Sequence, residues 1–174
     1  MKKVWKIIII TLIVLFVIAQ FIRPEKNNTI TNPENDIVFH LQIPTDVKKK
    51  LVDACYDCHS NKTKYPFYNN IAPVSWLMAN HVKEGKGRLN FSEWGTMDKK
   101  QQLKYLDEIC EVITNGEMPL KSYKFMHSNA VIDPGQLEAI CNWTEAAGEE
   151  LLMQKTAEPP KAEKAEEETE VEKE

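Results

Sequence analysis

Residues 54–60, Ala54-Cys55-Tyr56-Asp57-Cys58-His59-Ser60 or "ACYDCHS", place two of the chain's four cysteines beside one of its four histidines. Two thiols three positions apart with an adjacent imidazole can bind zinc, exchange disulfides or attach a haem covalently. Each of these three chemistries needs further features in the surrounding chain. Those features decide between them.

Zinc and disulfide exchange lack their companion features. A zinc site needs a second close pair of ligands, but Cys110 and Cys141 are thirty-one residues apart on apolar helical faces. A thioredoxin-type motif begins a helix after a strand, whereas residues 55–59 lie near the carboxyl end of an expected helix. Two thiols on one helical turn can instead reach both vinyl groups at one edge of a haem. The pattern favours attachment through Cys55 and Cys58, with His59 as the proximal iron ligand.

The chain around the motif has helical periodicity and no alternating strand pattern. Thr45 can cap a first helix, Pro73 suits the start of a second over residues 73–84, and Gly85 would close it. A third helix is expected over residues 97–115, ending at Gly116, and a fourth begins at Asp133 and Pro134. We therefore expect an all-α domain over residues 45–153, with a thin core that a cofactor would complete.

The two ends of the chain differ from this domain. Residues 7–22 carry no formal charge and are almost entirely apolar, so residues 1–22 are expected to form a membrane anchor rather than a cleaved signal peptide. With either a membrane anchor or a cleaved signal peptide, the domain that follows is expected outside the cytoplasm. Residues 23–44, rich in proline and asparagine, are expected to be a linker. Residues 154–174 are predicted to be an acidic disordered tail, because residues 155–174 contain four lysines, eight glutamates and little apolar surface.

The lysines at positions 2, 3 and 6 precede the apolar run, which favours a cytoplasmic amino terminus and a haem domain on the periplasmic side. No basic patch with interleaved aromatic residues is present, so a nucleic-acid partner is not expected. The partners we expect are redox proteins at or near the membrane.

Several side chains are candidates for the sixth position of the iron. Met118 follows the helix stop at Gly116 and precedes Pro119, which holds it in extended backbone where its sulfur can be aimed at a metal. His81 and His127 are alternatives, and His40 is expected to be exposed in the linker. A sixth position occupied only by water is a further alternative. Met118 is the preferred distal ligand and His81 the named alternative.

With these residues in place, the chain resembles the bacterial haem-binding domain family, which carries one CxxCH in a cytochrome c-like all-α unit. The matching segments are "CYDCHSNKTKYPFY", "IAPVSWLMANHVKEGKGRLNFSEW", "ITNGEMPLKSY" and "MHSNAVID". The resemblance implies thioether bonds at Cys55 and Cys58, His59 as the proximal ligand and one covalently bound haem c. Its MP element resembles the distal strap of class I cytochromes c, which implies Met118 as the sixth ligand.

Three further features are left open by the sequence. Cys110 and Cys141 can form a disulfide outside the cytoplasm or remain two buried thiols, and the free thiols are slightly preferred. Arg88 can pair with a haem propionate or be a solvated surface residue. Trp76, together with Phe91 and Trp94, is expected in the haem pocket or in the core.

The expected function is electron transfer by a membrane-anchored monohaem c-type cytochrome, since His/Met ligation leaves no open iron site. The chain is thus expected to be a carrier rather than a catalyst. The alternative is a haem-based peroxidase or a gas or redox sensor, which needs an open or displaceable distal ligand. A haem-bearing scaffold whose acidic tail docks a basic partner is a third possibility.

Overall fold

The computed structural model describes residues 2–26, 28–29 and 32–156, and every regular element among them is a helix. The all-α fold class predicted from the periodicity is confirmed. The α-helices are α1 (Lys2–Ala19), α2 (Thr45–Ala54), α3 (Tyr56–His59), α4 (Val74–Arg88), α5 (Lys99–Thr114), α6 (Lys121–Met126) and α7 (Pro134–Thr156). Short 3₁₀ helices lie between them: η1 (Pro33–Asn35), η2 (Ile37–Phe39), η3 (Phe67–Asn70), η4 (Phe91–Thr96) and η5 (Ser128–Ala130).

Several helix ends lie where the sequence predicts them. The α7 helix begins at Pro134, as predicted. The α2 helix begins at Thr45, but the prediction that Thr45 caps it was wrong, because Thr45 is already the first helical residue, Pro44 is the N-cap and no side chain caps the helix. Asp98 caps α5 by accepting the backbone N–H of Gln101 at 2.7 Å, which satisfies a donor that the first turn leaves free. Gly116 follows α5 with φ of +71°, the left-handed conformation that glycine adopts at helix ends. Local chemistry therefore sets these boundaries.

Gly85 does not end α4, so the predicted helix over residues 73–84 is too short. It lies inside α4, which continues to Arg88, and it is buried. A Cβ at this position would lie 2.6 Å from the carbonyl oxygen of Cys58. Glycine is thus required here for the close approach of α4 to α3, and not for a helix end.

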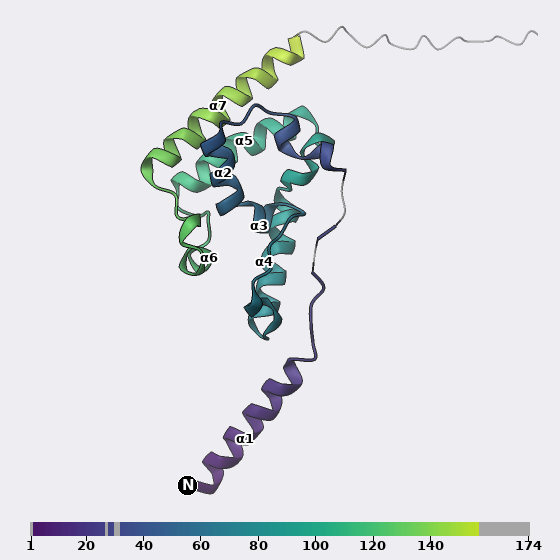
Figure 1. The fold of residues 1–174 in the computed structure, drawn as a ribbon, viewed down its shortest axis with the longest axis vertical. Helices are drawn as coiled ribbons and strands as arrows, with labels where there is room; N and C mark the ends of the chain where they lie inside the picture. The colour runs from purple at the N-terminus through teal and green to yellow at the C-terminus, as the bar shows by residue number, and fades with distance from the viewer. Residues whose placement is uncertain (1, 27, 30–31, 157–174) are drawn as a thin grey trace, which may run out of the picture.

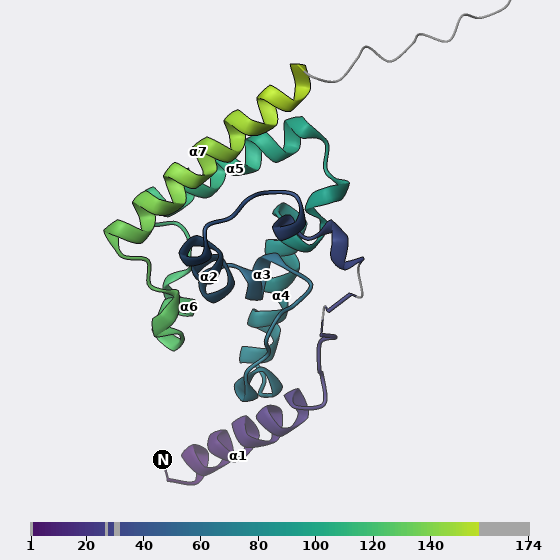
Figure 2. The same ribbon diagram turned by 45° about the horizontal axis from the view of Figure 1, so that its top comes forward.

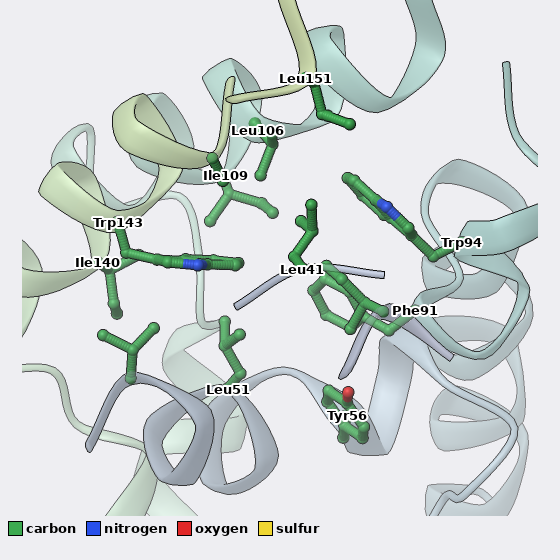
Figure 3. Close-up of a cluster of buried hydrophobic side chains, with 13 residues drawn as sticks. Leu41, Leu51, Tyr56, Phe91, Trp94, Leu106, Ile109, Ile140, Trp143 and Leu151 are labelled. Atoms are coloured by element: carbon green, nitrogen blue, oxygen red, sulfur yellow. The ribbon is translucent and has the colours of Figure 1, made fainter. Parts of the chain in front are cut away.

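The core lies between α2, α5, α7 and the segment around η4. Figure 3 shows its large side chains meeting from these elements, among them Trp94, which is fully buried. The α5 and α7 helices run side by side in both ribbon views (Figures 1 and 2). A disulfide joins Cys110 of α5 to Cys141 of α7. The slight preference for two free thiols was wrong, because the packing of α5 on α7 brings the two sulfurs together.

The segment predicted as a linker, residues 23–44, contains residues that pack in the core. Ile37 and Leu41 are buried with the other large apolar side chains. Asp36 is also buried, and its carboxylate accepts hydrogen bonds from Tyr56 Oη at 3.0 Å and from Lys62 Nζ at 2.7 Å. Residues just before α2 thus belong to the packed unit.

The α1 helix lies apart from this core, and none of its residues is buried (Figures 1 and 2). Within the part of the chain that the structure describes, no helix combines the length and the apolarity that crossing a membrane requires. At the other end, α7 extends to Thr156, so residues 154–156 of the predicted tail are helical. The disorder predicted for the rest of the tail concerns residues 157–174, which lie outside the described residues.

Candidate functional site

The cysteine–histidine motif lies where one helix stops and another begins. Cys55 departs from helical geometry (φ −124°, ψ −40°) between α2 and α3, although its N–H still reaches the Leu51 carbonyl at 2.9 Å. His59 N–H donates to the Cys55 carbonyl at 2.9 Å, which closes the turn of α3. The thiols of Cys55 and Cys58 are both unpaired and partly buried. The turn therefore presents two free thiols and an imidazole together.

The two residues between the cysteines connect this turn to other parts of the fold. Tyr56 stacks on Phe91 with ring centroids 5.2 Å apart, and its hydroxyl donates to the buried Asp36. Asp57 accepts the hydroxyl of Tyr123, on α6, at 2.7 Å. Hydrogen bonds and packing from two directions thus hold the motif in one orientation.

The ring of His59 has a defined tautomer. Its Nδ1 lies 3.1 Å from the carbonyl oxygen of Leu89, at the end of α4. Because a carbonyl oxygen can only accept, Nδ1 carries the proton, and the neutral ring keeps a lone pair on Nε2. Burial lowers the pKa of His59; hydrogen bonds to the Leu89 and Gly85 carbonyls oppose this shift, and the charge of Arg88 adds to it. The ring is therefore neutral at pH 7 and is held as a metal-binding imidazole is held.

Both thiols are protonated at neutral pH. Burial, with a contribution from Cys58, raises the pKa of Cys55 to about 12, and nearby Lys50 opposes the rise. Burial and the charge of Asp57 raise the pKa of Cys58 to about 11. Thiols that exchange disulfides have lowered pKa values instead. Nor do three or more His, Cys, Asp or Glu side chains converge as a metal-binding group anywhere in the described ranges.

A cavity of about 500 Å³ adjoins the motif at Cys58. Its wall comes from α3, the loop through η3, the amino-terminal half of α4, and α6 with the residues around it. Most of this wall is apolar, and two of its aromatic side chains are largely exposed: Phe67 at 80% and Phe125 at 87%. A cavity of this size and character is typical of a cofactor site.

The structure brings some of the predicted site residues to the cavity and leaves others away from it. His81 and His127 lie on the wall, as do Met78 and Met126, which the sequence analysis did not single out. Met118 does not belong to the wall; it is partly buried beyond α5, and its N–H reaches the Val112 carbonyl at 3.1 Å.

Arg88 is exposed in the last turn of α4, where its charge acts on His59. His40 is exposed, as expected, and its Nε2 lies 2.9 Å from the Glu34 carbonyl. Of the three aromatic residues left open, Phe91 and Trp94 lie in the core. Trp76 is 39% exposed and is not part of the cavity wall.

The sequence analysis missed the role of Tyr123. Besides its hydrogen bond to Asp57, its ring stacks on His127 with centroids 4.1 Å apart. The Tyr123 carbonyl lies 3.1 Å from His127 Nδ1, so that nitrogen is the donor. The only sequence signal was the position of Tyr123 at the end of "ITNGEMPLKSY".

The donor set and the cavity fit a haem. Two unpaired thiols three residues apart can bond to one edge of the macrocycle, and a neutral imidazole with a free Nε2 follows directly. An apolar cavity reaches the motif at Asp57 and Cys58, whereas Cys55 and His59 are not part of its wall. The comparison with protein families agrees, because the model of a family described as "Haem-binding domain" matches residues 14–146. No curated protein and no solved structure matches the chain.

Proposed function

The chain belongs to the haem-binding domain family, and from this premise we propose that it is a monohaem c-type cytochrome-like protein that carries electrons outside the cytoplasm. The observation that carries the proposal is the joint geometry of the motif. His59 is fixed by the Leu89 carbonyl with Nε2 free, and two unpaired thiols lie on the preceding turn, of which Cys58 lines an apolar cavity.

Cys55 and Cys58 would hold the haem through thioether bonds. In this addition each thiol S–H adds across one vinyl C=C bond, the sulfur bonds to one carbon and the hydrogen goes to the other. No electron acceptor is needed, and both thiols are in the protonated form at neutral pH. One haem per chain follows from the single motif.

His59 would be the proximal ligand, and the Leu89 carbonyl would orient its ring and increase its basicity. A bound haem supplies an iron that alternates between the ferrous and ferric states. Neighbouring residues hold this arrangement rigid. Asn90 Nδ2 donates to the side chain of Asn61 at 3.1 Å, which links the residues just after Leu89 to those just after His59.

Met118 remains our prediction for the sixth ligand, from its place before Pro119. Methionine opposite histidine raises the reduction potential and leaves no open site, which suits a carrier. His81 and His127 are the alternatives because both lie on the cavity wall. Arg88, one residue before Leu89, is the proposed partner of a propionate, since a guanidinium matches a carboxylate.

Residues 1–22 are proposed to hold the protein at the cell membrane, with the haem domain on the extracytoplasmic side. The support is the sequence: an apolar run preceded by three lysines. A tether of this kind raises the effective concentration of the domain near redox partner proteins of the membrane.

A second function is favoured by one observation. Met118 is not part of the cavity wall. If this arrangement persists with haem bound and neither His81 nor His127 ligates the iron, the sixth position would be open. The protein would then be a haem-based peroxidase or a gas or redox sensor. An open site binds carbon monoxide in the ferrous state, whereas a Met-ligated site resists it.

One set of spectra tests these proposals. Haem staining should survive denaturing electrophoresis of the wild-type protein and disappear when Cys55→Ala and Cys58→Ala are combined. The oxidised protein should show the near-red sulfur-to-iron charge-transfer band, and Met118→Ala should abolish it. Wild-type protein that lacks this band and binds carbon monoxide readily would overturn the carrier in favour of the second function.

A further inference from the structure

The carboxyl end of α1 is attached to the start of α4 by side-chain hydrogen bonds. Gln20 Oε1 accepts the N–H of Ala72 at 3.0 Å, and Gln20 Nε2 donates to the Ala72 carbonyl at 3.3 Å. Trp76 Nε1 donates to the carbonyl of Ile22 at 2.7 Å. These bonds give the haem domain a defined orientation relative to α1.

An exposed apolar surface lies beside this attachment. We call it the α4-end patch; its members come from η3, the turn after it and the first turn of α4, and they are Phe67, Ile71, Val74, Trp76 and Leu77. Their exposed fractions run from 39% to 80%. The amino-terminal end of α4 is the part of the domain nearest α1 in both views (Figures 1 and 2).

The surface of α1 is apolar on all sides. Its side chains from Ile7 to Ile18 are exposed, and nearly all of them are large and apolar. A helix of this kind needs an apolar environment around it, and the described part of the chain covers none of its faces. Arg23 and Lys26, with Glu25 between them, follow the helix at the level where lipid head groups would lie.

The α4-end patch continues this apolar surface onto the domain. Trp76 has the properties of a membrane-interface residue, since its ring is partly exposed while its N–H is satisfied by Ile22. Phe67, Val74 and Leu77 belong both to the patch and to the cavity wall. Whatever covers the patch therefore also contacts part of the cavity wall.

We propose that the α4-end patch rests on the surface of the lipid bilayer that surrounds α1, so that the cavity opens towards the membrane. This inference rests on the proposed membrane attachment of residues 1–22 and adds which face of the domain meets the lipid. A haem held in this cavity would then be closer to a redox partner lying in the membrane than to one on the aqueous side, because Phe67, Val74 and Leu77 belong both to the cavity wall and to the surface that meets the lipid.

Photocrosslinking in the full chain tests the orientation. The photoreactive residue p-benzoyl-phenylalanine replaces Ile71 in the patch, Ile10 in α1 or Leu152, which is 53% exposed and lies near the carboxyl end of α7. That end of α7 points away from α1 (Figure 1). Each protein is reconstituted in vesicles of phosphatidylcholine and phosphatidylglycerol and irradiated, and lipid adducts are measured by mass spectrometry.

Adducts at positions 10 and 71 but not at 152 are the expected result. Adducts at position 10 alone would overturn the orientation and leave the membrane attachment standing. An absence of lipid adducts at position 10 would overturn the proposed membrane attachment of residues 1–22. In that case, adducts at position 71 would still show whether the α4-end patch contacts lipid. Equal adducts at positions 71 and 152 would also overturn the proposal, because contact would have no preferred face.

A second pair of variants tests whether the hydrogen bonds set the orientation. Trp76→Phe keeps an aromatic ring but removes the donor to Ile22, and Gln20→Ala removes both bonds to Ala72. Each bond contributes about a fivefold factor to the docked population, so adducts at position 71 should fall several-fold while those at position 10 stay constant. If the yield of adducts at position 71 is unchanged in a variant that combines Trp76→Phe with Gln20→Ala, these hydrogen bonds do not set the orientation. The haem spectrum of each variant checks that the domain is folded.

Discussion

Two regions of this domain use apolar side chains in opposite ways. Around α5 and α7 they are buried against one another (Figure 3): Trp94 and Leu106 are at most 1% exposed. A disulfide also joins the two helices. Around α4 and α6 they line a cavity of about 500 Å³ and leave Phe67 and Phe125 mostly exposed. We refer to these as the packed region and the cavity region.

The difference shows where the cofactor contributes to the fold. Protein interiors are normally close-packed, and an apolar shell without filling loses the contacts that stabilise it. The packed region needs nothing more, whereas the cavity region would be completed by the haem that we propose to be held at Cys55, Cys58 and His59. Its elements should therefore depend on that group for their stability.

The largest effect should come from removing both attachment cysteines. Cys55→Ala with Cys58→Ala should abolish covalent haem and increase amide hydrogen exchange in α6 and η3 by on the order of 100-fold, since a ligand stabilises only the state that binds it. Exchange in the centre of α5 should change far less. Equal increases in both regions would show that the comparison does not hold.

The second-largest difference between the two regions should appear when one leucine in each region is replaced by alanine. Leu106→Ala should lower the free energy of unfolding by about 2–5 kcal/mol, because it opens a cavity in a packed core. Leu77→Ala, at a side chain 54% exposed, should cost less than about 1 kcal/mol in the haem-free chain. Urea denaturation of both variants in the haem-free background measures this, and similar losses would argue against an unfilled cavity region.

The disulfide should stabilise the packed region without affecting the site. Replacing Cys110 and Cys141 by alanine should lower the free energy of unfolding by about 2–4 kcal/mol, the range for a bridge closing a loop of this length. The haem spectrum should remain that of the wild type. A changed spectrum would show that the two regions are coupled more tightly than their contacts indicate.

A smaller effect is expected at the link between α6 and the motif. Tyr123→Phe removes the hydroxyl that donates a hydrogen bond to Asp57 at 2.7 Å. The loss should lower the free energy of unfolding by about 1–2 kcal/mol. The increase in hydrogen exchange should be confined to α6 and the motif. Tyr68→Phe is the matched control, since its hydroxyl has no hydrogen-bond partner in the described ranges, and it should change neither quantity.

The smallest expected effect is on the free energy of unfolding at alkaline pH. Burial and the charge of Asp36 raise the pKa of Tyr56 above its ordinary value of about 10. The folded state therefore holds this proton more tightly than the unfolded state, so the contribution to stability is complete below about pH 10 and declines as the pH rises further. Urea midpoints measured from about pH 9 to pH 11 should fall less steeply in Tyr56→Phe; an equally steep fall would assign it to other groups.

The helix boundaries that sequence reasoning identified correctly depend on neighbouring residues alone. The proline at the start of α7 and the glycine after α5 act through dihedral angles and hydrogen bonds within a few residues. Gly85 was misread because its role is a contact with Cys58, twenty-seven positions earlier in the chain. The short α6 helix has too few residues for a periodic signal.

The sequence by itself determined the helical class and the grouping of two thiols with an imidazole, because both are properties of residues close together in the chain. Tertiary structure decided that residues around Ile37 pack in the core, that Cys110 pairs with Cys141, and that His81 and His127 face the cavity while Met118 does not. It also placed the Leu89 carbonyl oxygen where it accepts a hydrogen bond from His59 Nδ1. Each of these depends on which distant surfaces meet when the apolar area is buried, and no local pattern encodes that.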